Sequence, residues 1–399
     1  MNNIDICNAE NKFGEEGEKH AAVSINHNKP IILSAGGTGG HLFPAKALSA
    51  ELIERGYQVH IITDKRALKI VHNFDGAKIY VVHSATFKSK SIRDLIKAIY
   101  HLIYGSYQSY RIFRKVKPVI VGGFGGYPTL PPMFVASSFI GKIFGIKTFI
   151  HEQNAVMGRA NKFLAKRVNV IAGGFLAKEG RYKKNIAVTG NPVRKDIIEA
   201  ASFLYKPPSV RGKFNLLVFG GSQGASFFSS VIPEAIALLE PSYRKRLYVV
   251  QQSRGDLIEL KDKYRKLGVD ANIAPFFYDL SKLMYSSHFI ISRSGASTIS
   301  ELSVIGRPAL LVPYPHAIDN DQQKNAARLE KSGGVYVYDQ HDLDAQKISV
   351  ILKDIMDNPK QLETMAKSVK RMGEPKATIN LAQLVEGLIC KRKYNEDTN

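Results

Sequence analysis

The stretch Gly36-Gly37-Thr38-Gly39-Gly40-His41-Leu42-Phe43-Pro44 decides how this chain of 399 residues folds. It follows the apolar run 31–33 and leads into a pattern typical of a helix, so it predicts a strand, a glycine-rich turn and a helix start. The glycines allow positive φ and close approach of backbone N–H groups to an anion, and the helix start adds partial positive charge. The stretch therefore predicts a phosphate-binding turn with His41 at its edge. The alternative is a tight turn in which His41 is only a polar residue of the first helical turn.

Two more glycine clusters follow apolar runs. Residues 122–127 (GGFGGY) come after the run 119–121, and residues 220–225 (GGSQGA) come after the run 216–219. Because each cluster ends a predicted strand, the three together suggest two nucleotide-binding-like domains rather than one.

Standard nucleotide-binding motifs do not fit these clusters. The pattern Gly-x-Gly-x-x-Gly, started at Gly37, meets Leu42 where its last glycine should stand. The two Gly-Lys pairs are followed by Ile143 and Phe214 rather than by Ser or Thr, which argues against the phosphate loop of an ATPase. Asp64, after the second predicted strand, keeps a nicotinamide-dependent dehydrogenase as an alternative.

Strands and helices alternate from Pro30 onward. The predicted strands are 31–35, 57–63, 78–83, 119–121, 148–151, 168–172, 186–189, 214–219, 247–251, 271–275, 289–292, 309–313 and 335–338. Nearly continuous apolar strands separated by helices indicate parallel sheets buried on both faces. The predicted fold class is α/β, with two Rossmann-like domains and a hinge near Pro192.

Four segments are expected. Residues 1–29 are polar, without the apolar core of a signal peptide, and are predicted to be a disordered extension. Residues 30–192 and 193–374 form the two domains, and residues 375–399 form a last helix and tail that could pack back on the first domain. Two cysteines near opposite ends, Cys7 and Cys390, suggest no disulfide framework and favour a cytoplasmic protein.

The net charge of +21 calls for an acidic partner. Between Lys78 and Lys117 there are nine basic residues (78, 88, 90, 93, 97, 111, 114, 115 and 117) and one acid, Asp94. Apolar residues at helical spacing accompany them (92, 95, 96, 99, 102 and 103), which suits an anionic membrane surface. A helix that packs this apolar stripe into the core is the alternative.

Nucleic acid is disfavoured as a partner because the basic cluster matches no DNA-binding or RNA-binding motif. Residues 127–146 are too interrupted by proline to span a bilayer.

Together these motifs resemble the MurG family of peptidoglycan glycosyltransferases, in glycosyltransferase family 28. The resemblance runs from about Pro30 to the last helix. It rests on residues 36–41, 122–127, 151–154 (HEQN), 190–194 (GNPVR), 220–225, the segment 292–301, and residues 321–326. It implies the GT-B fold, in which two Rossmann-like domains face each other across a cleft.

The resemblance also implies an activity. N-acetylglucosamine is transferred, with inversion, from UDP-N-acetylglucosamine to the 4-hydroxyl of N-acetylmuramoyl-pentapeptide diphospho-undecaprenol, at the cytoplasmic face of the membrane. Implied partners are these two substrates, an anionic membrane surface and other cell-wall synthesis proteins. No cofactor or metal is expected, because loop amides, helix dipoles and Arg194 can stabilise the departing diphosphate. The alternatives are another UDP-sugar-dependent GT-B enzyme, a UDP-N-acetylglucosamine 2-epimerase, or a non-enzymatic nucleotide-binding module.

The site residues follow from the same resemblance. The donor contacts are Thr38, Gly39, Gly40, Asn154, Arg194, Ser222, Phe277, Ala296, Ser297, Thr298, Ile299, Ser300, Glu301 and Gln322. The acceptor contacts are Gly37, His41, Gly123, Gly125, Gly126, Tyr127, His151 and Glu152. His41 is the expected catalytic base, because the imidazole of a histidine titrates near neutral pH, with His151 and Glu152 as alternatives.

Particular side chains suit particular parts of the donor. The carboxylate of Glu301 can accept both ribose hydroxyls, or it can be a solvated helix carboxylate. Ser222 can hold the diphosphate, cap a helix, or do both. Phe277 stands where the family has an aliphatic residue, which leaves a backbone contact to uracil as its expected role.

Overall fold

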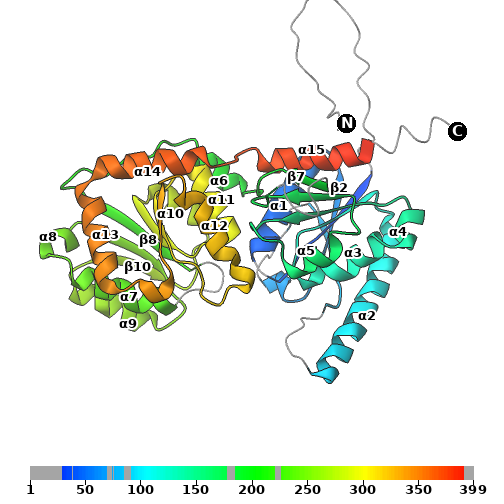
Figure 1. Cartoon of the computed structure of the whole chain (residues 1–399), viewed down its shortest axis with the longest axis horizontal. Coiled ribbons are helices and arrows are strands. Elements are labelled where there is room, and N and C mark those ends of the chain that lie inside the picture. Colours follow the sequence, from blue (N-terminus) through cyan, green and yellow to red (C-terminus); the bar gives the residue numbers. More distant parts are fainter. Residues whose placement is uncertain are drawn as a thin grey trace, which may run out of the picture.

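The computed structural model describes residues 29–37, 39–69, 74, 76–84, 91–177, 185–220 and 226–390 (Figure 1). Several sequence predictions lie outside these residues. They are the extension up to residue 28, the tail after residue 390, the donor contacts Thr38 and Ser222, and the basic residues Lys88 and Lys90.

The first domain is built on a parallel sheet of seven strands in the order β3-β2-β1-β4-β5-β6-β7. Its strands are β1 (Pro30–Ser34), β2 (Gln58–Thr63), β3 (Lys78–Val81), β4 (Ile120–Gly123), β5 (Lys147–Glu152), β6 (Val170–Gly173) and β7 (Ile186–Val188). Its helices are α1 (Gly39–Glu54), α2 (Ile92–Val116), α3 (Leu130–Ala136), α4 (Phe139–Ile143) and α5 (Arg159–Leu164). The strand order reverses between β1 and β4, and ligands of open α/β sheets bind at such a point.

The second domain repeats the plan with six parallel strands in the order β10-β9-β8-β11-β12-β13. Its strands are β8 (Phe214–Phe219), β9 (Leu247–Gln252), β10 (Asp270–Ala274), β11 (Phe289–Ser292), β12 (Ala309–Leu311) and β13 (Val335–Val337). Its helices are α6 (Lys195–Ala200), α7 (Ser226–Ala237), α8 (Pro241–Arg244), α9 (Leu257–Lys266), α10 (Leu280–Ser286), α11 (Ala296–Ile305), α12 (Asp321–Glu330), α13 (Ala345–Asp357) and α14 (Pro359–Arg371). Here the strand order reverses between β8 and β11. We call such a place a switch point, and α11 begins at the switch point of this second sheet.

The predicted fold class is confirmed. Each of the thirteen predicted strands overlaps a strand of the described residues, and all of these strands pair in parallel. The ends differ by a few residues. Strand β12, for example, stops at Leu311 instead of Pro313, which has no N–H to donate to a neighbouring strand.

The last helix, α15 (Ala377–Cys390), returns from the second domain and lies along the first (Figure 1). Its apolar residues Leu381, Val385 and Ile389 are buried in the same core cluster as residues of α1, β1 and β2. An ion pair of 2.7 Å between Arg55 and Glu386 fastens it further. The chain therefore passes between the domains twice, once before α6 and once before α15.

Helix α2 extends outward from the first domain, on the side away from the second domain (Figure 1). Its middle is anchored, because Gly105 lies so close to α3 that a side chain there would reach Pro131 at 3.1 Å. Among the described residues, no helix combines the length and the apolar character that crossing a bilayer requires.

Candidate active site

The first two glycine clusters meet at the switch point of the first sheet. Because β1 and β4 are paired neighbours, the turns that follow them emerge side by side. A side chain at Gly126 would lie 2.5 Å from the carbonyl oxygen of Gly36, and one at Gly36 would lie 2.5 Å from the ring of Pro128. Gly37, Gly125 and Gly126 have φ values of 88°, 94° and 76°, which favour glycine. The glycines thus let two backbone turns pack together beside the start of α1.

His41 lies in the first turn of α1 and is held from two sides. A side chain at Gly125 would come within 3.1 Å of the imidazole ring, so the ring rests against the second glycine turn. The ring atom Nδ1 lies 3.1 Å from Oε1 of Gln153, just after β5. Because the side chain is half-buried, part of it remains accessible.

The structure places His151 and Glu152 inside the protein, with exposed fractions of 0% and 1%. The imidazole Nε2 of His151 lies 3.0 Å from the carbonyl oxygen of Gly190. The carboxylate of Glu152 accepts hydrogen bonds from the backbone N–H groups of Asn154 (3.1 Å) and Gly158 (2.9 Å) and from the Asn161 amide (2.8 Å). His151 is thus bonded to the segment that leads to the second domain, and Glu152 holds the turn after β5. Their predicted role as acceptor contacts stays a prediction.

The burial of His151 predicts a pH-dependent stability. Burial lowers the pKa of His151 to about 4, and the hydrogen bond to Gly190 offsets only part of this. Since the unfolded histidine titrates near 6.5, its contribution is fully present above that pH and is lost as pH falls toward 4. Between pH 7 and 5 we expect the parent to lose about 2 kcal/mol more free energy of unfolding than a His151→Gln variant.

Denaturant unfolding at several pH values measures this difference. The control is His341→Gln, at an exposed histidine of the second domain, whose curve should stay parallel to that of the parent. Parallel curves for the parent and His151→Gln would show that His151 does not titrate in this way.

An ion pair joins the segment between the domains to α11. Arg194 Nε lies 3.1 Å from Glu301 Oε1, and the guanidinium stands over the ring of Phe43 at 5.6 Å. Burial raises the pKa of Glu301, and Arg194 offsets only part of that rise. Burial also acts to lower the pKa of Arg194, but Glu301 and Asp196 outweigh it, so the pKa is raised. The raised pKa of Arg194 favours a charged guanidinium, whereas the raised pKa of Glu301 disfavours its charged form. The contact at 3.1 Å stabilises the carboxylate, because an opposite charge that close favours ionisation.

The start of α11 faces the start of α1. Ser297 Oγ lies 3.5 Å from the carbonyl oxygen of Gly40, so donor residues predicted from both domains come together here. Within the run 296–301, Ser297 and Thr298 are half-exposed, whereas Ile299 is packed in the core. Ser300 is buried and donates to the carbonyl oxygen of Ala296 at 2.8 Å. A ligand can therefore reach this run mainly through its first turn.

Asn154 meets the second domain through a residue that the sequence predictions did not assign to the site. Asn325, fully buried on α12, donates to Asn154 Oδ1 at 3.0 Å and accepts from the Ala155 N–H at 2.9 Å. Its only signal in the sequence is its place in the segment 321–326. On the same helix, Gln322 accepts from the backbone N–H of Tyr314 at 2.9 Å.

The remaining predicted residues lie around this junction or beside it. Gly123 ends β4, Tyr127 begins the next short helical turn and is half-exposed, and Phe277 packs half-buried against the core of the second domain. A cavity of about 90 Å³ lies between the domains, lined among others by Asn191 and Ser300.

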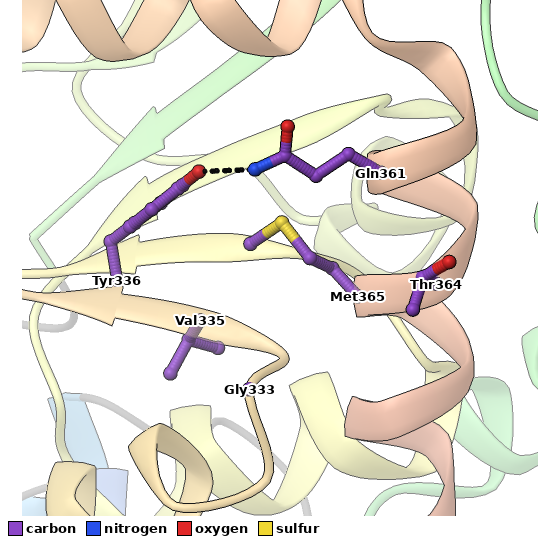
Figure 2. Close-up of a pocket in the computed structure, with 6 residues that line it drawn as sticks. All are labelled: Gly333, Val335, Tyr336, Gln361, Thr364 and Met365. Atoms are coloured by element: carbon purple, nitrogen blue, oxygen red, sulfur yellow. Dashed lines mark hydrogen bonds between the residues drawn. The ribbon is translucent and has the colours of Figure 1, made fainter.

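A larger cavity of about 390 Å³ lies between β13 and α14 (Figure 2). Its lining residues are Gly333, Val335, Tyr336, Gln361, Thr364 and Met365, and a hydrogen bond of 2.8 Å joins Gln361 to the Tyr336 hydroxyl. None of the predicted site residues lines it. The junction of glycine turns, α11 and α12 is therefore the candidate site, despite the size of this cavity.

Known proteins resemble the chain along almost its whole length. The N-terminal domain of glycosyltransferase family 28 matches residues 31–172, and the C-terminal domain of that family matches residues 215–381. Relatives named UDP-N-acetylglucosamine–N-acetylmuramyl-(pentapeptide) pyrophosphoryl-undecaprenol N-acetylglucosamine transferase are similar. The one from Bartonella tribocorum is 52% identical over 93% of this chain and 97% of its own, and the one from Brucella suis is 50% identical over 92% and 96%.

A solved structure agrees with these relatives. The crystal structure of MurG from Acinetobacter baumannii superposes with a TM-score of 0.71 at 25% identity and covers 90% of this chain and 99% of its own. A UDP-N-acetylglucosamine 2-epimerase from Listeria monocytogenes superposes with a TM-score of 0.61 at 12% identity, which shows a shared fold alone. The chain therefore belongs to glycosyltransferase family 28, as an N-acetylglucosamine transferase of the MurG type.

Proposed function

We propose that this protein transfers N-acetylglucosamine from UDP-N-acetylglucosamine to N-acetylmuramyl-pentapeptide on pyrophosphoryl-undecaprenol. The observation that carries the proposal is the match, at 52% identity over 93% of the chain, to a relative with that name. The junction of the two domains supports it, because the glycine turns of the first domain and the starts of α1 and α11 converge there. Such groups bind phosphates through backbone N–H groups and partial positive charge.

In the proposed mechanism, the 4-hydroxyl of the muramyl sugar attacks the anomeric carbon of the donor sugar, and UDP departs with inversion. His41 removes the proton from the attacking hydroxyl, since its imidazole is accessible at the glycine turns and a histidine ordinarily titrates near neutral pH. The start of α11 and Arg194 stabilise the negative charge that develops on UDP. Glu301 accepts hydrogen bonds from the ribose hydroxyls with the carboxylate lone pairs that Arg194 does not occupy.

The other predicted residues take supporting roles. The acceptor diphosphate lies against the turns that contain Gly37, Gly125 and Gly126, with Gly123 and Tyr127 beside them. His151 and Glu152 position these turns from within the protein instead of contacting substrate, because their hydrogen bonds are made to the chain itself. Asn154 and Gln322 face the donor sugar from the two sides of the junction, and Phe277 contributes backbone contacts to the uracil. Thr38 and Ser222, outside the described residues, complete the proposed donor contacts.

An activity assay tests the proposal. The protein is incubated with radiolabelled UDP-N-acetylglucosamine, with and without a lipid-linked muramyl-pentapeptide acceptor. We expect label to enter the lipid fraction only when the acceptor is present. Formation of an epimer of the donor without acceptor would instead identify a 2-epimerase, and no conversion of either kind would point to a binding protein.

We further propose that the transfer requires no metal or cofactor. Near the junction, the carboxylates of Asp319 and Asp321 are close enough in sequence to raise the question of a bound cation. However, Asp319 lies 3.5 Å from the Lys162 ammonium, and burial raises the pKa of Asp321, which disfavours the charged form that a cation needs. Treatment with EDTA should leave the transfer rate unchanged. A loss of activity that Mg²⁺ restores would contradict this part of the proposal.

The substrate also requires contact with a membrane, and α2 and α4 offer a surface for it. We call it the apolar surface. It comprises the exposed residues Ile92, Leu95, Ile96, Ile99, Tyr100, Ile103, Tyr104, Tyr107, Phe139, Ile140, Ile143 and Phe144. Ile92 is 75% exposed and Phe139 is 77% exposed, so this stripe of α2 does not pack into the core. Several exposed apolar side chains along one helix, as on α2, mark an interaction site.

Basic side chains accompany the apolar surface. Arg93 and Lys97 lie on the same exposed half of α2, and Lys142 and Lys147 lie on and just after α4. Each basic residue near an anionic bilayer contributes about 1 kcal/mol of attraction. We therefore propose that the apolar surface rests on the cytoplasmic face of the bacterial inner membrane. There the polyprenyl chain stays in the bilayer while its diphosphate reaches the glycine turns.

Substitutions in this surface should separate membrane binding from catalysis. A variant with Ile96→Ser, Ile103→Ser, Arg93→Glu and Lys97→Glu is expected to sediment less with anionic vesicles at ~0.15 M salt. It should transfer more slowly to the full-length lipid acceptor, yet retain transfer to a short-chain acceptor, because the junction between the domains is unchanged.

The control is Leu204→Ser with Ile258→Ser. Both residues are 76% exposed but lie in the second domain. Equal sedimentation of the variant and the parent would show that the apolar surface is not the membrane-binding site.

A further inference from the structure

A chain of hydrogen bonds leads from the interior of the first domain to His41, and Gln153 is its central member. Gln153 is buried at the end of β5. Its Nε2 donates to the carbonyl oxygen of Phe124 at 3.0 Å and lies 3.2 Å from Nδ1 of His151. Its Oε1 lies 3.1 Å from Nδ1 of His41. Both ends of one amide are therefore in use.

Two backbone carbonyls fix the direction of every bond in this chain. A carbonyl oxygen can only accept, so Phe124 determines that the NH₂ of Gln153 faces inward and that Oε1 faces His41. Gly190 likewise requires that His151 carries its proton on Nε2 and offers the lone pair of Nδ1. The second N–H of Gln153 then donates to that lone pair at 3.2 Å, and the carbonyl oxygen of His151 is a longer second acceptor at 3.4 Å. Since Oε1 has only lone pairs to offer, His41 must donate from Nδ1.

We propose that Gln153 is a positioning residue that holds His41 as the Nδ1–H tautomer, so that the lone pair of Nε2 is free for the acceptor hydroxyl. The proposal rests on the role of His41 as the base. The orientation of a catalytic imidazole is commonly set by the bond that its other nitrogen makes. A carboxylate that accepted this bond would place a negative charge behind the imidazole, whereas here a neutral amide accepts it.

The inner member of this chain of hydrogen bonds, His151, is also uncharged. A protonated His151 would offer N–H groups on both nitrogens and would force the Gln153 amide to turn. Its burial, which lowers the pKa to about 4, keeps it neutral at physiological pH. Beside His151 on β5, Glu152 is the adjacent titratable side chain. The oxygens of Glu152 accept bonds from the following turn.

Nitrogen-15 NMR of the histidines in the full-length parent protein tests the tautomer directly. At pH 7.5 we expect the His41 signal to show a proton on Nδ1 and the His151 signal to show a proton on Nε2. The His41→Ala and His151→Gln variants assign the two signals. A proton on Nε2 of His41 in the parent would overturn the inference.

The Gln153→Met variant tests the role of the amide. Methionine has a similar length but offers no comparable acceptor, so His41 should shift toward the mixture of tautomers that a free imidazole adopts. We expect kcat to fall about 10-fold while KM for UDP-N-acetylglucosamine changes less than about 2-fold. Gln252→Met is the control, because Gln252 is also a buried glutamine at a strand end and donates to a carbonyl, that of Pro275.

The outcomes separate this inference from the proposed mechanism. If the tautomer of His41 is unchanged in Gln153→Met, Gln153 does not set it and the inference fails, whatever the activity. If the tautomer changes but kcat does not, the assignment of Gln153 holds and His41 is not the base.

Discussion

Replacing His41 with alanine is expected to lower turnover by about 10²- to 10⁴-fold while the affinity for UDP-N-acetylglucosamine stays nearly the same. The reason is that the imidazole acts only in the transition state, when the acceptor hydroxyl loses its proton. The side chain lies at the glycine turns of the first domain, whereas the groups proposed to hold UDP belong mainly to the second. Steady-state kinetics give the turnover, and calorimetry with UDP gives the donor affinity.

The control for His41 is His316→Ala, at an exposed histidine of the second domain whose ring lies 5.5 Å from that of Tyr314. It should behave as the parent in both measurements. If His41→Ala loses donor affinity in proportion to its turnover, His41 belongs to the phosphate-binding turn and another group is the base.

Replacing Glu301 with alanine is expected to weaken UDP binding by about 1.5 to 3 kcal/mol, the usual size for hydrogen bonds to a charged group. In affinity this is about 10- to 150-fold. Two effects add here, because the ribose loses its acceptor and Arg194 loses the carboxylate that holds it at 3.1 Å. Calorimetric titration with UDP measures the loss, and thermal unfolding shows whether the variant is folded.

Two further variants separate the causes. Glu301→Gln keeps an acceptor for the ribose but removes the charge that holds Arg194, so it should lie between alanine and the parent. Glu259→Ala, at an exposed carboxylate paired with Lys263 on α9, should bind UDP as the parent does. Unchanged UDP affinity in Glu301→Ala would remove Glu301 from the site.

The sequence predicted the sheets and the glycine turns better than it predicted the contacts between side chains. Apolar runs ended by glycine report local preferences, and these preferences decided where the strands lie. The bond between His41 and Gln153 joins residues 112 positions apart, and that between Asn154 and Asn325 joins residues 171 apart. Such pairs depend on how the whole chain packs, which no local pattern contains.

Helix α2 shows a related limit. The apolar spacing in residues 92–103 predicted a helix with one apolar face, but spacing does not tell whether that face meets a core or a membrane. The structure shows the face exposed. The motif HEQN at 151–154 shows the same limit. Its three buried members and its half-exposed member Asn154 look equally suitable for binding a ligand when only the sequence is read.

The course of α15 has a consequence for how the protein is made. The cluster that buries Leu381, Val385 and Ile389 also contains Leu48 and Leu52 of α1, which leave the ribosome more than 300 residues earlier. During synthesis the apolar residues of α1 that pack against α15 therefore stay exposed to solvent until the second domain has been synthesised. A nascent chain stalled at residue 374 should be cleaved by proteases in its first domain far faster than the released protein. Assembly of the two domains is in this sense a single event, completed by the last fourteen residues of the described chain.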